Sequence, residues 1–245
     1  MNILIVGASG ATGRLLVQQL LERGHSVKAV VRAADRLPDS VRDHAGLTVI
    51  EAAVLDLSDA AMAEHVRGCD AVACCLGHNL TLKGIYGQPR RLVTQATRRL
   101  CQAVQANDPE QPVKFVLMNT VGNRNRDLDE PASLGQRAVI GLLRVALPPQ
   151  VDNEQAAEVL RTEIGQHNAA VEWVAVRPDG LTDEDTVTDY RLFPSPIRSP
   201  IFNPGKTSRI NVAHFMAELI DDDALWQEWR GQMPAVYNAA SAQEV

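Results

Sequence analysis

Short apolar runs alternate with apolar residues at helical spacing along most of the chain. Continuous apolar runs are typical of strands buried on both faces of a parallel sheet. Such runs or strand-like segments lie at residues 3–6, 27–31, 47–51, 71–75, 113–118 and 171–176. Between the first two of these runs, apolar residues recur at helical spacing, namely Leu16, Val17, Leu20 and Leu21. The alternation predicts an α/β fold, a Rossmann-like doubly wound parallel sheet, in a single domain over residues 1–245.

The first run ends in a glycine-rich turn that leads directly into the first helical pattern. Glycine lets backbone N–H groups approach a pyrophosphate closely, and the helix N-terminus adds unpaired donors and a partial positive charge. An ordinary strand-to-helix turn is the alternative interpretation. The pattern predicts a dinucleotide site made of Gly7, Ser9, Gly10, Ala11, Thr12 and Gly13.

Arg32 directly follows the second run, at the place where NAD-specific sites carry an acid that bonds the ribose 2′-hydroxyl. An arginine there pairs with the 2′-phosphate of NADP, which a carboxylate would repel. Arg36 could close a second side of that phosphate. We therefore expect NADP(H) to be preferred over NAD(H), unless both are solvated loop arginines.

Two further strand ends carry candidate cofactor residues. Asp56, beside Leu57, is placed to accept a hydrogen bond from the adenine amine, although aspartate is also a common turn former. Leu76 and Gly77 follow the fourth run, where small residues let a dinucleotide lie flat over the sheet. His78 enters the next loop, and a lone histidine there is more often incidental than catalytic.

The fifth run ends in Met118, Asn119 and Thr120. Because ligands of open parallel sheets lie outside the carboxyl ends of the strands, these residues are expected to face the nicotinamide. Capping of the turn is the alternative role for their polar side chains.

Residues 123–150 are expected to form a lid or a subunit contact. A polar loop over residues 123–129 precedes a mostly apolar segment, residues 134–147, which contains Arg137 and Arg144. That segment is too short and too charged to span a bilayer. Packing into the core is the alternative role for this segment. A homodimer is one of the possible oligomeric states, because a short apolar helix serves a lid or an interface equally well. Another helical stretch is expected to begin at Asp152.

Composition adds expectations about class and surroundings. The 245 residues are 45% hydrophobic and 22% charged, with a net charge of −6, which suits one compact soluble domain. The mild acidic excess gives no reason to expect nucleic acid or a membrane as a partner. A strand beginning at Asn2 leaves no room for a signal segment, so a cytoplasmic protein is expected. Buried, reduced cysteines and no metal site are expected from the scattered Cys69, Cys74, Cys75 and Cys101.

The ordered motifs resemble those of the atypical short-chain dehydrogenase/reductases. They comprise the Gly-x-x-Gly-x-x-Gly turn, Arg after the second strand, Asp-Leu after the third, Leu-Gly after the fourth and Val-Arg-Pro-x-x-Leu at residues 176–181. Within that family the chain is similar to the NAD(P)H-binding group of biliverdin IXβ reductase/flavin reductase and NmrA-like proteins. The resemblance implies that Pro178 borders the cofactor, that Asn211 caps a late helix, that residues 236–238 form the closing strand and that residues 181–245 form a small substrate portion.

The Tyr-x-x-x-Lys pair of most dehydrogenases of the wider superfamily is missing. If Glu158 matches the acid that usually follows the pair, Gln150 stands in place of Tyr and Glu154 in place of Lys. Hydride transfer to a flavin or a bilin needs mainly orientation of the nicotinamide, because solvent can deliver the proton.

The resemblance leaves the catalytic residue unknown. Asp152 belongs to an acidic stretch similar to that of the group, in which a basic residue is common at the position of Asn153. The candidates near the nicotinamide are Asn119, Thr120 and Asp152.

Two functions fit these features. The first is an NADPH-dependent reductase of a small planar conjugated acceptor, such as a flavin, a quinone or a tetrapyrrole. The second is an NmrA-like redox sensor that holds the dinucleotide and reports its state through residues 123–150. A nucleotide-sugar epimerase fits poorly, because the Tyr and Lys are missing and the chain is short. The apolar acceptor pocket is expected to be walled by Leu80, Leu82, Ile85, Leu142, Leu143, Leu192 and Phe193.

Overall fold

A computed structural model describes residues 1–78, 81, 85–128, 130 and 133–242. Its main sheet consists, in spatial order, of β3 (Leu47–Glu51), β2 (Ser26–Val31), β1 (Asn2–Val6), β4 (Ala71–Cys74), β5 (Val113–Met118), β6 (Val171–Pro178), β10 (Ala235–Asn238) and β8 (Tyr190–Phe193). Neighbouring strands pair in parallel, except for the antiparallel pair of β10 and β8. A small parallel pair is formed by β7 (Gly180–Thr182) and β9 (Lys206–Ser208).

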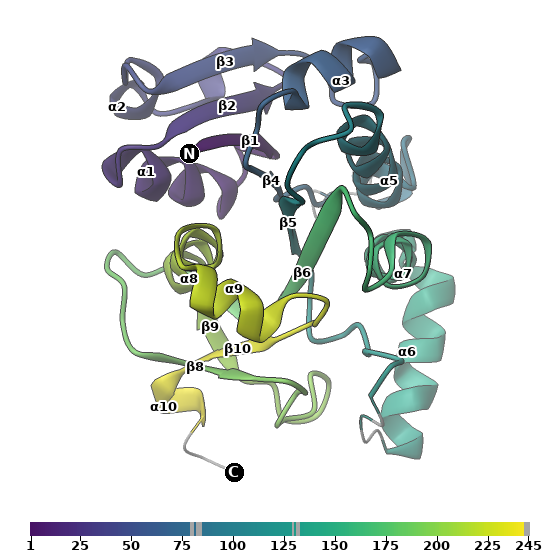
Figure 1. Cartoon of the computed structure of the whole chain (residues 1–245). Helices are drawn as coiled ribbons and strands as arrows, with labels where there is room; N and C mark the ends of the chain where they lie inside the picture. The colour runs from purple at the N-terminus through teal and green to yellow at the C-terminus, as the bar shows by residue number, and fades with distance from the viewer. Residues whose placement is uncertain (79–80, 82–84, 129, 131–132, 243–245) are drawn as a thin grey trace.

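Helices cover both faces of the sheet (Figure 1). One face carries α1 (Gly13–Glu22), α8 (Arg209–Asp221) and α9 (Asp223–Trp229). The opposite face carries α3 (Asp59–Val66), α5 (Leu92–Ala106) and α7 (Pro148–Glu158), which continues as a π-helical stretch over Val159–Ile164. The remaining helices are α2 (Asp39–Arg42), α6 (Leu134–Ala146), α10 (Ala239–Ala242) and the 3₁₀ turn Ala34–Arg36.

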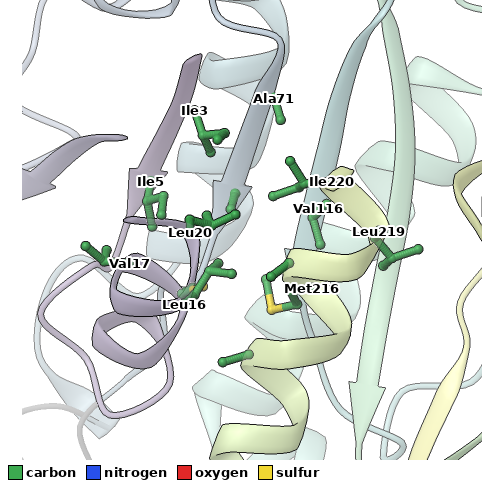
Figure 2. Close-up of a cluster of buried hydrophobic side chains, with 14 of the residues drawn as sticks. Ile3, Ile5, Leu16, Val17, Leu20, Ala71, Val116, Met216, Leu219 and Ile220 are labelled. Atoms are coloured by element: carbon green, nitrogen blue, oxygen red, sulfur yellow. The ribbon is translucent and has the colours of Figure 1, made fainter. Parts of the chain in front are cut away.

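Strand β1 shows why the sheet needs both layers. Its side chains alternate between the two faces, and all from Ile3 to Val6 are buried. Ile3 and Ile5 pack with the apolar stripes of α1 and α8, as Figure 2 shows. Leu4 and Val6 belong to the second core under α3, α5 and α7. Continuous apolar runs therefore mark strands covered on both sides, as the pattern predicts.

The doubly wound parallel sheet is confirmed, and so is the closing strand at residues 236–238, observed as β10. All four cysteines are buried and free of disulfides, as expected. Within the described ranges, no helix is long and apolar enough to cross a membrane.

The expected cap of the late helix is wrong. Ser208, in extended conformation at the end of β9, is the N-cap of α8, and its Oγ accepts from the backbone N–H of Asn211 at 3.3 Å. Asn211 lies in the first turn, where its N–H needs an acceptor and its side chain faces the interior. The expected helix start at Asp152 is also too late, because α7 begins at Pro148, and proline is favoured in a first helical turn.

Candidate functional site

The turn between β1 and α1 is built so tightly that only glycine fits at two positions. Gly7 has φ of +76°, and a Cβ there would lie 2.5 Å from the carbonyl carbon of Cys75. A Cβ on Gly13 would lie 2.2 Å from the carbonyl oxygen of Gly7. The first glycine therefore lets β1 approach the end of β4, and the last lets α1 start directly against the turn.

The N-terminus of α1 is open. Its N-cap residue, Thr12, forms no side-chain capping bond, and the first turn carries no acid. Thr12 itself is buried, Ser9 is half-buried, and Gly10 and Ala11 are exposed. Exposed backbone around an uncapped helix start is the arrangement that suits a phosphate group.

Two arginines follow β2 at the same edge of the sheet. Arg32 and Arg36 are both exposed. Neither forms an ion pair with any residue in the part of the chain that the structure describes. The nearby Glu51 is already engaged, since its Oε2 accepts from the backbone N–H of Ala34 at 3.0 Å. Both guanidinium groups are thus available to an anion.

The loop after β3 is held by a residue that the sequence analysis missed. Asp56 is exposed, and Leu57 is half-buried against the core. From α5, Arg99 donates to the carbonyl oxygen of Leu55 at 2.9 Å and to that of Leu57, and it pairs with Asp59 at 2.8 Å. Arg99 therefore sets the path of the loop that presents Asp56. Its only sequence signal is a place on the polar face of a helical pattern.

The ends of β4 and β5 complete the edge. Leu76 is half-buried, and Gly77 is exposed with open space where a Cβ would be. Asn119 is buried, accepts from the N–H of Thr120 at 2.8 Å and donates to the carbonyl oxygen of Asn153 at 3.0 Å. Asn119 thus joins β5 to α7.

Thr120 and Met118 are both half-buried at this strand end. The Thr120 hydroxyl accepts from the N–H of Gly122 at 3.2 Å, and Met118 packs against the core beneath α1 and α8. Pro178, at the end of β6, is buried and accepts from the N–H of Val121 at 3.1 Å.

Parallel pairing brings these strand ends together. Since β1 to β6 run in the same direction, the residues that follow them share the carboxyl edge of the sheet. The sequence-predicted cofactor residues lie at these strand ends or in the connections that follow them, so the predicted set is distributed along one edge of the sheet.

Gln150 and Glu154 lie close to Thr120. The Gln150 amide donates to the carbonyl oxygen of Gly122 at 3.3 Å and to Glu154 at 2.9 Å. Glu154 is in turn paired with Arg144 of α6 at 2.8 Å. Gln150 and Glu154, which the sequence analysis expects at the positions of Tyr and Lys, therefore form one hydrogen-bonded chain beside the end of β5.

Asp152 is fully buried, and its carboxylate is surrounded by donors. It accepts from the N–H groups of Val93 at 2.8 Å and Thr94 at 2.9 Å, from the Thr94 hydroxyl at 2.7 Å, and pairs with His78 at 2.7 Å. Burial alone would raise the pKa of Asp152, but the hydrogen bonds, led by that from His78, hold it below its ordinary value. This carboxylate caps the first turn of α5 in place of a local side chain, because Arg91 at the N-cap forms no such bond.

A pocket of about 520 Å³ lies next to the end of β5. Val121, directly after Thr120, forms part of its wall. The full lining is Val121, Arg124, Glu130, Ser133, Gln136, Pro196, Ile197, Arg198, Ser199 and Pro200.

The expected apolar wall does not line this pocket. Leu142 is 67% exposed on α6, and Phe193 packs against Tyr237 with the ring centres 6.0 Å apart. Leu142 is on the outward side of α6. Leu192 and Phe193 belong to β8, which pairs with β10 at the edge of the main sheet. None of the five described members of that set is in the lining, namely Ile85, Leu142, Leu143, Leu192 and Phe193. The other two members, Leu80 and Leu82, lie outside the described residues.

A buried ion pair holds one residue of the pocket lining, Glu130, in place. Arg177 is fully buried, and its Nη2 lies 2.8 Å from Oε1 of Glu130, which is also buried. Arg177 further donates to the carbonyl oxygens of Met233 at 2.6 Å, Asn123 at 3.0 Å and Pro194 at 3.1 Å. Its place in the Val-Arg-Pro motif is visible in the sequence, but its partner, 47 residues away, is not.

Known proteins resemble the chain over most of its length. A model of the NAD(P)H-binding family matches residues 7–223. An uncharacterized chloroplastic protein of Arabidopsis thaliana is 35% identical over 186 residues, which make up 75% of this chain and 60% of that protein. The chain thus spans less than two thirds of that relative.

Solved structures share the fold. A short-chain dehydrogenase/reductase from Veillonella parvula in complex with NADP has a TM-score of 0.70 at 18% identity, covering 98% of this chain and 95% of that chain. An anaerobilin reductase from Escherichia coli O157:H7 has a TM-score of 0.67 at 18% identity, covering 98% of each chain. The family match over residues 7–223 shows that the chain belongs to the NAD(P)H-binding family, and the glycine turn and the doubly wound sheet agree with that assignment.

Proposed function

We propose that the protein is an NADPH-dependent reductase of a small planar conjugated acceptor, such as a flavin, a quinone or a tetrapyrrole. The observation that carries the proposal is the pocket of about 520 Å³ beside Thr120, next to the strand end expected to face the nicotinamide. That volume is in the usual range for small-molecule sites. The likeness in fold to an anaerobilin reductase supports the choice of acceptor class.

Arg32 and Arg36 support NADP(H) over NAD(H). Both are exposed beside the open N-terminus of α1 and lack carboxylate partners among the described residues. Two guanidinium groups would hold the 2′-phosphate, while the glycine turn would hold the pyrophosphate.

Reduction would depend on orientation rather than on an acid side chain. Bound NADPH would supply the hydride. Gln150 cannot release a proton as a tyrosine does, and Glu154 is paired with Arg144. Asp152 serves as a buried cap, so the role that its geometry supports is structural. Asn119 and Thr120 would border the nicotinamide, and solvent would supply the proton.

A redox-sensing function is the alternative, and one observation favours it. On α6, Leu134 is 82% exposed and Leu142 is 67% exposed. They are eight positions apart, so they lie on one side of the helix. A partner protein, or a second copy of the chain, could cover this surface. A change in the conformation of residues 123–150 would then alter the binding of that partner and report the state of the dinucleotide.

Turnover separates the two functions. Purified protein should oxidise NADPH faster when FMN, menadione or biliverdin is added, as followed by NADPH absorbance. The control is the same mixture of NADPH and acceptor without the protein, which should show no acceleration. A flat response to every acceptor, with NADPH still bound, would favour the sensor.

A further inference from the structure

The pocket beside Thr120 contains a guanidinium group, that of Arg124, which pairs with no carboxylate of the described residues. Two of its lining residues are arginines, Arg124 and Arg198, contributed by segments far apart in the sequence. Arg198 donates to the carbonyl oxygen of Ser241 at 2.6 Å and to Oδ1 of Asn203 at 2.9 Å, so its guanidinium group is held by the protein.

Arg124 is held less firmly. Its Nη2 donates to the carbonyl oxygen of Glu130, and its Nε is buried without a hydrogen-bond partner. It forms no ion pair with a carboxylate of any residue within the described ranges. A half-buried guanidinium with so few partners favours an added acceptor, because unmet donors cost free energy when they leave water.

The one acid in the lining does not offset this charge. Both carboxylate oxygens of Glu130 accept from Arg177, at 2.8 and 3.1 Å, and Oε2 also accepts from the N–H of Asn125 at 2.8 Å. All three interactions are buried. Arg177 therefore compensates the charge of Glu130. The charge of Arg124 is not compensated by Glu130 and is available to a ligand in the pocket.

The rest of the wall is mixed. Ser199 donates to Oε1 of Gln136 at 3.0 Å, so these polar groups are fixed in place. Val121, Ile197, Pro196 and Pro200 supply the apolar part of the lining. Such a wall suits a ligand with an apolar body and a negatively charged substituent.

We propose that Arg124 binds an anionic substituent, a carboxylate or a phosphate, of the hydride acceptor. The inference rests on the proposed function, because it assigns this pocket to the acceptor. It narrows the acceptor class from any planar conjugated molecule to those that carry an acid group.

Matched ligand pairs test the proposal. FMN and riboflavin share one ring system and differ by a phosphate, whereas biliverdin and its dimethyl ester differ by two carboxylates. Dissociation constants are measured by fluorescence or absorbance titration in the presence of saturating NADP⁺, which prevents turnover. The wild-type protein should bind at least one charged member about tenfold or more tightly than its uncharged counterpart, as expected for a charge-assisted contact.

The variants locate the effect. Arg124→Gln should bring that ratio close to one, and Arg124→Lys should restore part of it. Arg126→Gln is the matched control, because Arg126 is exposed, pairs with Glu158 at 3.2 Å and is absent from the pocket lining. It should keep the wild-type ratio. Thermal unfolding of each variant excludes a loss of fold.

Ratios near one for both pairs in the wild-type protein would overturn the proposal, as would an equal loss in Arg126→Gln. Binding that depends on Arg124, without oxidation of NADPH, would retain the anion site and contradict the reductase. Oxidation of NADPH by menadione, with both ratios near one, would contradict the anion site and retain the reductase.

Discussion

Two regions of the main sheet are built by different means. On the cofactor side, around β1 and β4, the backbone shapes the site, because Gly7 and Gly13 bring main-chain segments closer than any side chain would allow. On the pocket side, around β6 and β10, buried polar side chains do so, and Arg177 and Asn211 are both fully buried. A site shaped by the backbone depends on residues adjacent in sequence. A site assembled by polar side chains depends on residues that only folding brings together.

Asn211 shows the second kind of construction in detail. Its Oδ1 accepts from the N–H of Thr188 at 2.9 Å, and its Nδ2 donates to Oδ1 of Asn238 at 2.9 Å. One side chain thus connects α8, the segment before β8 and the end of β10. Removing such a group leaves several buried polar atoms unpaired.

Breaking the buried pair should have the largest effect. Arg177→Met leaves the carboxylate of Glu130 buried without its partner, and we expect the free energy of unfolding to fall by about 3–5 kcal/mol. Urea denaturation measures the change. Hydrogen exchange should rise around residues 123–130 and 194–200, while β1 to β4 stay protected.

The matched control removes both charges. The double variant Arg177→Met with Glu130→Met should regain most of the lost stability, because no buried charge is left unpaired. A single variant that costs less than about 1 kcal/mol would contradict the role assigned to this pair.

A change on the cofactor side should affect binding rather than folding. Arg32→Asp should weaken NADPH binding by about 1.5–3 kcal/mol, the scale of a charged hydrogen bond, because it replaces an attraction to the 2′-phosphate with a repulsion. Calorimetric titration measures the change in binding free energy. NADH lacks that phosphate, so the variant should bind NADH at least as tightly as the wild-type protein does. Unchanged NADPH affinity would rule out Arg32 as the phosphate ligand.

The smallest effect is expected for a residue that acts through a loop. Arg99→Gln removes the hydrogen bonds to the carbonyl oxygens of Leu55 and Leu57, and we expect NADPH affinity to fall by about 1 kcal/mol. Nicotinamide mononucleotide in its reduced form lacks the adenine half, so its affinity should not change. An equal loss for both ligands would show that Arg99 acts on the whole fold instead.

The same contrast explains what the sequence could predict. The buried strands are visible because each carries its own apolar run, and the glycine turn is visible because its parts are neighbours. β7, β8 and β9 were not predicted, since they are short, lie between residues 180 and 208 and carry many polar residues.

Long-range polar contacts explain the remaining differences. The sequence indicates Asn211 as the cap of α8, whereas Ser208 is the cap, because both residue types favour caps and only the end of β9 decides between them. The five described residues of the expected apolar wall do not line the pocket, whereas Arg124 and Arg198 do. No local pattern indicates that residues 196–200 fold back toward α6.

The carboxylate of Asp152 has a consequence for dividing the chain. It lies on α7 but completes the first turn of α5, and the same group pairs with His78 after β4. If the chain were cut between β5 and α6, the first fragment would retain an uncapped helix and the second a carboxylate with no donors. The two fragments would have to associate to recover these bonds, so a split version of this protein should regain its cofactor site only when both pieces are present together.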